Sequence, residues 1–235
     1  MKKFGLIGHP ITHSASPALF AKAYGGRWPY DLIEGEDFKV SWQRFLDEYQ
    51  AINITAPFKE DAFRKVAECG VLGDDIRAIG AINIAVKEAD GKVHGYNSDY
   101  LGVMKVLQDH GFGTGGTVVV AGFGGAGKAA AAAARALGCD VVICNRTRYT
   151  PDIRPLEELP VLAGVADILI YTLTFPIPEL EAISGPGASL EANYREPCLA
   201  GRPGYIPGDE WHRAQAETGY PLMTGIPIIF RTLQH

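Results

Sequence analysis

The stretch TVVVAGFGGAGKAAAAAARALGCDVVICNRT, residues 117–147, decides the fold of this chain. It reads as a strand, a glycine-rich turn, an alanine-rich helix and a second strand, which is the order of a βαβ unit. The turn places Gly122, Gly124 and Gly127 at the spacing G-x-G-x-x-G. In that setting the first glycine permits the tight turn, the second lets the backbone approach a pyrophosphate, and the third lets the helix pack on the strand. The stretch therefore predicts a dinucleotide site at the helix N-terminus, and a glycine turn that merely packs tightly is the alternative.

The residues after the second strand indicate which dinucleotide is bound. That strand ends at Cys144, where NAD-preferring sites place an acid for the ribose 2′-hydroxyl. This chain has NRTR at 145–148 instead. The side chains of Asn145, Arg146 and Thr147 offer amide, guanidinium and hydroxyl donors, which suit a 2′-phosphate. The sequence therefore predicts NADP as the cofactor, with a solvated basic loop as the alternative.

Composition sets the protein class. The 235 residues are 47% hydrophobic and 21% charged, which is enough apolar surface for one large or two small domains. The net charge of −5 argues against broad nucleic-acid binding. The longest apolar runs are far shorter than a membrane span, so we expect no membrane segment and no exported chain. Four cysteines without a CxxC pair indicate a reduced, cytoplasmic protein.

Short apolar runs alternate with longer amphipathic stretches, a pattern typical of a mainly parallel α/β sheet. The segment EADGK at 88–92 predicts a hairpin turn, and residues 99–110 have a helical pattern that leads into the glycine-rich passage 111–116. The predicted strands are Lys3–Ile7, Tyr30–Ile33, Ala51–Ile54, Ala81–Val86, Val93–Tyr96, Thr117–Ala121, Asp140–Cys144 and Asp167–Tyr171.

Polar side chains follow the first and third of these strands. Ser14 and Ser16 come after the first, and Thr55 and Lys59 come after the third. In open α/β sheets the carboxyl ends of strands line the ligand crevice. Lys59 also opens a predicted helix, where a positive charge opposes the helix dipole, so a surface lysine is the less natural reading.

Structural alternatives exist for several of these residues. Asp99, in GYNSD at 95–99, is equally suited to cap a helix. Ser14 and Ser16 are also possible caps, and Asn83 is a possible bulge residue.

Taken together, the motifs resemble those of the shikimate dehydrogenase family. GHPITHSASP resembles its substrate-carboxylate motif, NITAPFK its lysine motif, AIGAIN its asparagine-bearing strand and GYNSDYLG its aspartate motif. GFGGAGKA and NRT resemble its NADP signatures, and GDEWHRAQAETGYPLMTG resembles its C-terminal segment. They occur in the family's order across nearly the entire chain.

The resemblance implies a role for each matching residue. Ser14, Ser16 and Tyr194 would bind the substrate carboxylate, and Thr55, Asn83 and Gln215 would bind ring hydroxyls. Lys59 and Asp99 would form the catalytic pair. The implied cofactor-binding residues are Gly122, Gly124, Gly125, Ala126, Gly127, Asn145, Arg146 and Thr147.

The implied architecture is an α/β fold of two domains. Residues 1–101 would form an α/β substrate-binding and catalytic domain with a mainly parallel sheet. Residues 102–207 would form a Rossmann-like NADP-binding domain, and residues 208–235 would return to the first. The protein would be a monomer or a homodimer.

The implied reaction is the NADP-dependent, reversible reduction of 3-dehydroshikimate to shikimate, a step toward chorismate and the aromatic amino acids. A positioned ammonium suits it, because hydride addition to a ketone develops negative charge on oxygen. Hydride transfer needs no metal, and the chain has neither HExxH nor a tight His/Cys cluster, so we predict no metal site.

Three other functions remain open. A quinate/shikimate dehydrogenase that uses NAD is disfavoured by NRTR. A folate-linked dehydrogenase would want a large apolar slot. A non-catalytic shikimate- or NADP-binding relative is suggested by DILIYTLTFPIPE at 167–179, which lacks the family's usual Asn-Ala-Thr-Ser stretch and Gly-Met loop. Glu191 also stands where the family commonly has Asp.

Overall fold

The computed structural model describes residues 1–185 and 187–228. The chain forms two compact units. The first unit comprises Met1–Ser98 and the chain from Ala216 onward, and the second comprises Asp99–Gln215. The sequence places the divisions at 101/102 and 207/208. In the structure the first division falls at 98/99, inside α5 (Ser98–Asp109), and the second at 215/216, inside α8 (Gly208–Thr224). Each of these helices therefore contributes residues to both units.

The first unit is built on a six-stranded sheet with the order β2-β1-β3-β5-β6-β4. Strand β1 pairs in parallel with both β2 and β3, and β4 pairs in parallel with β6. The hairpin strands β5 and β6 supply the antiparallel pairs. The expected mainly parallel α/β sheet is confirmed. The strand bounds are β1 (Phe4–Gly8), β2 (Tyr30–Glu34), β3 (Ala51–Ile54), β4 (Val71–Leu72), β5 (Ile84–Lys87) and β6 (Val93–Tyr96).

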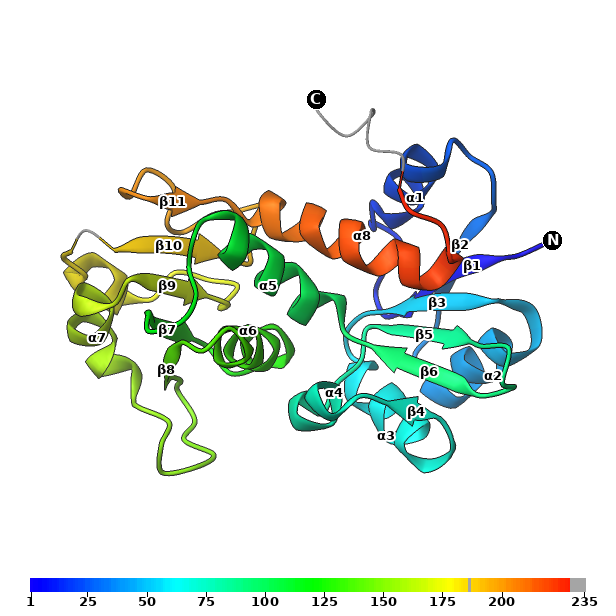
Figure 1. Cartoon of the computed structure of the whole chain (residues 1–235), viewed down its shortest axis with the longest axis horizontal. Helices are drawn as coiled ribbons and strands as arrows, with labels where there is room; N and C mark the ends of the chain where they lie inside the picture. Colours follow the sequence, from blue (N-terminus) through cyan, green and yellow to red (C-terminus); the bar gives the residue numbers. More distant parts are fainter. Residues whose placement is uncertain (186, 229–235) are drawn as a thin grey trace. The chain divides into compact units, whose positions relative to one another are not determined.

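Helices cover both faces of this sheet (Figure 1). Helix α1 (Ser16–Tyr24) and the C-terminal part of α8 lie over one face, and α2 (Phe38–Glu48), α3 (Lys59–Cys69) and α4 (Asp74–Ile79) lie over the other. The α1 face is filled by aromatic rings, with Phe20 packed against Phe4, Tyr30 and Tyr220 at centroid distances of 4.8–5.1 Å. Aromatic side chains bury a large apolar area each, so this cluster joins α1 and α8 to the sheet.

The predicted hairpin is confirmed, with a shorter first strand. Its turn is closed by hydrogen bonds from Glu88 N to Lys92 O and from Gly91 N to Glu88 O, and Gly91 has φ 78°, which favours glycine. The sequence predicts a strand from Ala81, whereas β5 begins at Ile84. The backbone bonds of Asn83 to Ile54 and Tyr96 continue the ladder one residue further.

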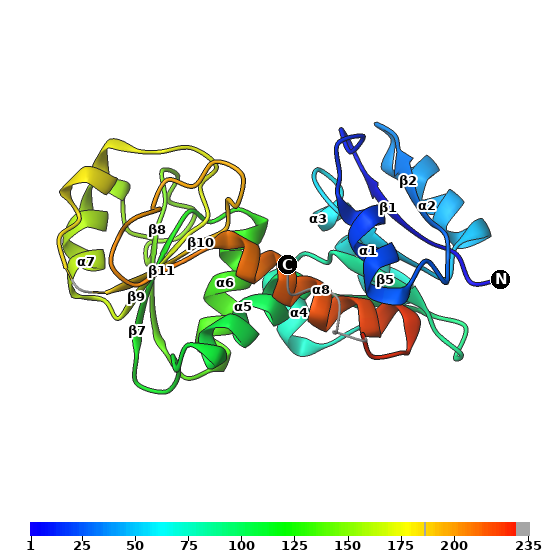
Figure 2. The same cartoon turned by 90° about the horizontal axis from the view of Figure 1, so that it is seen from above.

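The second unit holds a five-stranded parallel sheet with the order β11-β10-β9-β7-β8. The chain runs from β7 through α6 to β8 on one side, and β9 pairs with β7 on the other, so the glycine turn after β7 lies where the strand order reverses. Figure 2 shows α6 and α7 on opposite faces of this sheet. The bounds are β7 (Thr117–Ala121), α6 (Gly125–Ala136), β8 (Asp140–Cys144), the 3-10 helix η1 (Leu156–Glu158), α7 (Leu159–Val165), β9 (Ile168–Tyr171), the 3-10 helix η2 (Pro178–Ala182), β10 (Ala188–Glu191) and β11 (Tyr205–Ile206).

Three short strands, β4, β10 and β11, are not predicted by the sequence. Two of them have only two residues, and β10 reads ASLE, which carries no β-branched or aromatic residue. Their pairing with longer neighbours makes them strands. Glu191 at the end of β10 is fully buried, and its carboxylate accepts hydrogen bonds from Cys198 N at 2.7 Å and Leu199 N at 3.0 Å.

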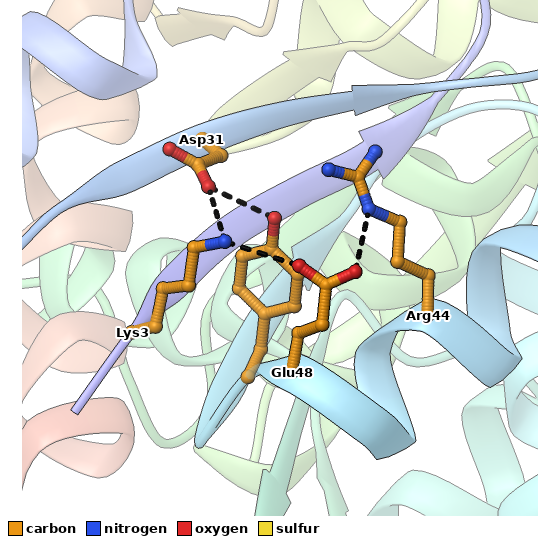
Figure 3. Close-up of polar contacts among 5 residues, drawn as sticks. Lys3, Asp31, Arg44 and Glu48 are labelled. Carbon is orange, nitrogen blue, oxygen red and sulfur yellow. Dashed lines mark hydrogen bonds and ion pairs between the residues drawn. The ribbon is translucent and has the colours of Figure 1, made fainter. Parts of the chain in front are cut away.

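An ion-paired network lies at the amino ends of β1 and β3 (Figure 3). Lys3 Nζ lies 3.0 Å from Asp31 Oδ2 and 3.1 Å from Glu48 Oε2, and Arg44 Nε lies 3.1 Å from Glu48 Oε1. Tyr49 donates to Asp31 at 2.9 Å and presents its ring to the Lys3 ammonium. We call this cluster the amino-edge network.

None of the helices in residues 1–185 and 187–228 has the length and apolar character that a membrane crossing requires.

Candidate functional site

The carboxyl ends of β1 and β3 lie together at one edge of the first sheet, because the two strands are parallel neighbours. Thr55, directly after β3, donates its backbone N–H to Ile7 O at 3.0 Å. A Cβ at Gly8 would overlap the Thr55 methyl group, so only glycine lets the end of β1 come this close. We call this part of the first unit the carboxyl edge.

Ser14 and Ser16 are brought together in the loop that leads from β1 into α1. Their hydroxyl oxygens lie 3.1 Å apart, and Ser14 Oγ also accepts from Ser16 N at 3.3 Å. Both residues are half-buried. The pair offers two hydroxyl groups side by side at the start of a helix, an arrangement suited to an anionic group.

Lys59 is the first residue of α3 and is half-buried. Its carbonyl oxygen accepts from Ile82 N at 3.2 Å, which ties the start of α3 to the segment that carries Asn83. Glu60 and Asp61 follow in the first turn, where carboxylates suit the helix dipole. The helix start is therefore acidic apart from this one ammonium group.

Asn83 is buried and binds the start of α5. Its Oδ1 accepts from Ser98 N at 2.7 Å, and its Nδ2 lies 3.1 Å from Ser98 Oγ. The carboxamide thus satisfies a backbone N–H that the helix itself cannot pair. Asp99, which the sequence offered as a cap, is the second residue of α5.

Sequence reasoning missed two residues that connect these groups. The Tyr30 phenol donates to Asn53 Oδ1 at 2.7 Å and is also hydrogen-bonded to Ser16. Burial raises the pKa of Tyr30 well above its usual value, so the phenol stays protonated. Asn53 Nδ2 in turn lies 3.5 Å from Asn83 O. Asn53 could have been found because it opens the motif NITAPFK, whereas nothing in the sequence singles out Tyr30.

In the second unit, Asp99 and Gln215 are fixed by the contact between α5 and α8. Asp99 is 5% exposed, and its carbonyl oxygen accepts from Trp211 Nε1 at 3.1 Å. A Cβ at Gly102 would lie 3.0 Å from both Cγ and N of Gln215, so glycine permits the two helices to pack closely here. The second unit therefore holds these two candidates on adjacent helices.

Tyr194 lies in the loop after β10, and its ring is stacked on His212 of α8. The ring centroids are 4.8 Å apart and the planes differ by 16°. Tyr194 is 43% exposed, which leaves its phenol accessible. His212 was not among the residues singled out from the sequence.

The glycine turn has the geometry that a dinucleotide requires. Gly122 has φ 95°, a conformation that favours glycine. A Cβ at Gly127 would overlap the carbonyl group of Gly122, so the helix could not pack this closely with any larger residue. A Cβ at Gly124 would meet no atom of the described residues within 4 Å, which leaves the approach to the α6 N-terminus open. Gly125 and Ala126 form the first turn of α6, whose N–H groups suit a pyrophosphate.

The loop after β8 is tied to this turn through Asn145. Its Oδ1 accepts from Phe123 N at 3.2 Å, and its Nδ2 donates to Thr147 O at 2.8 Å. Arg146 and Thr147 are exposed. Arg148 instead donates to Ile153 O at 2.9 Å, so its guanidinium closes the loop. Arg146 and Thr147 therefore remain available to an anion, and the residues fit a 2′-phosphate.

The unusual segment after β9 is held by its own contacts. Thr172 Oγ1 donates to Ala121 O at 2.9 Å, and the Tyr171 phenol donates to Phe175 O at 2.6 Å. Phe175 is 50% exposed. These two contacts fix the chain that follows β9, where the sequence departs from the resemblance.

Within the described residues, no group of three or more His, Cys, Asp or Glu side chains is placed to hold a metal ion.

Comparison with known proteins identifies the family. The model of the shikimate dehydrogenase substrate binding domain matches residues 6–85. A shikimate dehydrogenase (NADP(+)) from one strain of Thermus thermophilus is 32% identical over 243 residues, covering 97% of this chain and 88% of the relative. One from Natronomonas pharaonis is 36% identical over 186 residues, covering 72% of this chain and 68% of the relative.

A solved structure has the same fold along nearly the whole chain. The shikimate 5-dehydrogenase from another strain of Thermus thermophilus, in complex with NADP(H) and shikimate, has a TM-score of 0.82 and 27% identity. The match covers 97% of this chain and 95% of that structure. With sequence and fold in agreement, the chain belongs to the shikimate dehydrogenase family.

Proposed function

We propose that this protein is an NADP-dependent shikimate dehydrogenase, which catalyses the reversible reduction of 3-dehydroshikimate to shikimate in the biosynthesis of chorismate and the aromatic amino acids. The observation that carries the proposal is the carboxyl edge of the first sheet. That edge carries paired hydroxyls, a threonine and a lysine after β1 and β3, and an amide directly before β5. These are the donors and acceptors that a small polyhydroxy acid needs.

Substrate binding is assigned to polar side chains outside the catalytic pair. The Ser14 and Ser16 hydroxyls, 3.1 Å apart, donate to the carboxylate, assisted by the exposed phenol of Tyr194. Thr55, Asn83 and Gln215 bind the ring hydroxyls. Asn83 can do so only in part, because its Oδ1 already accepts from Ser98 N at 2.7 Å.

Lys59 and Asp99 are the proposed catalytic residues. When bound, NADPH supplies the hydride that reduces the ketone. Negative charge then develops on the ketone oxygen, where the Lys59 ammonium stabilises it and donates the proton. The carboxylate of Asp99 orients the lysine and the hydroxyl that forms.

NADP is assigned to the second unit. The N-terminal N–H groups of α6, from Gly125 onward, bind the pyrophosphate, with Gly124 leaving room for its approach. Arg146 and Thr147 bind the 2′-phosphate, and Asn145 orients their loop through its bonds to Phe123 and Thr147. The absence of an acid among residues 145–148 argues for NADP over NAD.

The cellular setting follows from the proposed pathway. The four cysteines are free in the structure, which fits a reducing compartment. We therefore place the enzyme in the cytoplasm, as a monomer or a homodimer that acts on small molecules and not on nucleic acid.

The test is the absorbance at 340 nm with shikimate or quinate as substrate and NADP or NAD as acceptor. The proposal expects the shikimate and NADP pair to have the highest kcat/KM. A higher kcat/KM with quinate and NAD would assign the enzyme to the other reaction. Shikimate binding by calorimetry without turnover would make it a non-catalytic relative.

A further inference from the structure

The ring of Tyr194 stacks on the imidazole of His212 within the second unit. The two rings are nearly parallel, 16° apart, with centroids separated by 4.8 Å, which is within the range for stacked aromatic pairs. Tyr194 comes from a loop, whereas His212 comes from a helix of 17 residues. A half-exposed loop side chain is thereby held by a rigid element.

The helical position of His212 connects it to other site candidates. The preceding residue, Trp211, is 1% exposed and donates to the carbonyl oxygen of Asp99 at 3.1 Å. Gln215 follows three residues later on the same helix and packs against Gly102. Residues three apart lie on the same face of a helix. His212 therefore joins the loop of Tyr194 to the helix face that carries Gln215.

We propose that His212 is a positioning residue for the substrate carboxylate, because its imidazole fixes the ring of Tyr194 in the orientation in which the phenol binds substrate. The inference deepens the proposed function and rests on it. The role is separate from catalysis, since the imidazole contacts the Tyr194 ring and acts through it.

Burial of His212 favours a neutral imidazole. Burial lowers the pKa of His212, and the nearby Arg195 lowers it further, while the carboxylates of Asp99 and Asp209 oppose the shift. Arg195 also lies 5.8 Å from the centroid of the Tyr194 ring. Because a neutral ring can stack on the Tyr194 ring, a phenyl group of similar size can replace the imidazole of His212.

The experiment compares two substitutions of His212. His212→Phe keeps a flat ring, whereas His212→Leu keeps apolar volume without one. His212→Leu is expected to raise the KM for shikimate about 3- to 10-fold, the scale of one aromatic pair, with kcat changed by less than about 3-fold. His212→Phe is expected to keep KM within about 2-fold of the parent, since stacking is retained. The KM for NADP should be unchanged in both.

A double mutant tests whether the effect passes through the phenol. When Tyr194→Phe has already removed the hydroxyl, His212→Leu should raise the shikimate KM by less than about 2-fold, because residues that act as a unit are not additive. His110→Ala is the matched control. The imidazole Nε2 of His110 lies 2.9 Å from Oε2 of Glu210, which belongs to α8 as His212 does. Because His110 pairs with Glu210 and not with Tyr194, its loss should leave the shikimate KM unchanged.

Three results would overturn the inference. Equal KM increases in His212→Phe and His212→Leu would show a polar role, an unchanged KM in His212→Leu would show no role, and additivity with Tyr194→Phe would show a path other than the phenol. Failure of the proposed function looks different, because the parent enzyme would then show no turnover of shikimate. Melting temperatures of all variants identify any that do not fold. If His212→Leu does not fold, the KM of His212→Phe decides, because an increase of more than about 2-fold would overturn the inference.

Discussion

The two ends of the first sheet use polar residues in opposite ways. At the amino end, Lys3 is bound to Asp31 and Glu48, so each charge has a fixed partner of opposite sign (Figure 3). At the carboxyl end the Ser14 and Ser16 hydroxyls lie 3.1 Å apart, the Asn83 carboxamide is hydrogen-bonded to Ser98, and Lys59 begins α3. A side chain held in an ion pair has fewer hydrogen-bonding groups left for a ligand. A hydroxyl or an amide still has donors and acceptors after it has made one hydrogen bond.

This contrast shows that the position of a charged residue on the sheet helps to predict whether it has a structural or a ligand-binding role. Lys3 and Lys59 are both half-buried lysines next to a strand of the same sheet. One precedes β1 at its amino end and the other follows β3 at its carboxyl end. Ligands of open α/β sheets bind at carboxyl ends. The predictions below test whether the two ends differ in function as they do in structure.

The largest effects are expected from removing either member of the proposed catalytic pair, and the carboxylate is considered first. Asp99→Asn should lower kcat by about 10²-fold or more, because the lysine and the reacting hydroxyl then lose the carboxylate that orients them. Combined with Lys59→Ala, the total loss should be smaller than the sum of the two free-energy penalties. Steady-state kinetics with shikimate and NADP measure all three variants. Strictly additive penalties would show that the two residues act independently.

The next effect concerns the paired hydroxyls. Ser14→Ala or Ser16→Ala should raise the KM for shikimate, each lost contact to a charged carboxylate being worth about 1.5–3 kcal/mol. The value of kcat should change much less. The methyl ester of shikimate is the control substrate, because it lacks the charge that the serines would bind. Equal use of acid and ester by the parent enzyme would remove the carboxylate role from both serines.

A third prediction extends the contrast between paired and ligand-binding charges to the second unit. Arg146→Ala should weaken NADP binding by about 10- to 100-fold, the scale of one charge-assisted contact, while barely affecting NAD. Arg154 supplies the matched control, since its guanidinium is paired with Glu158. Arg154→Ala should leave both affinities unchanged. Calorimetric titration with each cofactor measures the difference, and equal losses for NADP and NAD in Arg146→Ala would refute the assignment.

The smallest effect is the contribution of the amino-edge network to stability. Hydrogen bonds from Lys3 lower the pKa of Glu48. Burial acts to raise the pKa of Asp31, but hydrogen bonds from Lys3 and Tyr49 outweigh it, so the pKa of this carboxyl is also lowered. Carboxyls with a lowered pKa in the folded state stabilise it above their unfolded pKa values. That stability is lost as the pH falls through the folded values.

Lys3→Met should therefore flatten the acid dependence of the melting temperature. Between pH 6 and pH 3 the parent is expected to lose about 1–3 °C more than the variant, because exposed ion pairs contribute little each. Differential scanning calorimetry at several pH values measures this. Identical slopes for the two proteins would show that the network does not contribute to acid stability.

Much of the fold was readable from local patterns. Strands Ala51–Ile54, Thr117–Ala121 and Asp140–Cys144 were predicted at their observed bounds, because each is a short, mainly apolar run limited by turn or helix signals. Strand β10 was not predicted, since Glu191 looks like a loop residue until its carboxylate is seen to bind two backbone N–H groups. Such a contact depends on the tertiary structure and leaves no periodic signal.

The sequence indicates candidate site residues but not the contacts that connect them. Ser14, Ser16, Thr55 and Lys59 could be found because each follows a predicted strand. The bond from Asn83 to Ser98 and the stacking of Tyr194 on His212 could not, because each joins segments separated by 15 or more residues. The roles of these side chains remain predictions, and kinetics must decide them.

The most direct test of the central claim is the kcat of Lys59→Ala measured beside that of Lys3→Ala, with saturating shikimate and NADP. Loss of a positioned general acid should reduce kcat by about 10²- to 10⁴-fold in Lys59→Ala. Lys3→Ala, at the amino end of the same sheet, should keep kcat within about 2-fold of the parent, as expected for a surface substitution. A Lys59→Ala enzyme that retains more than about a tenth of the parental kcat would contradict the account, because that lies outside the range for a lost general acid.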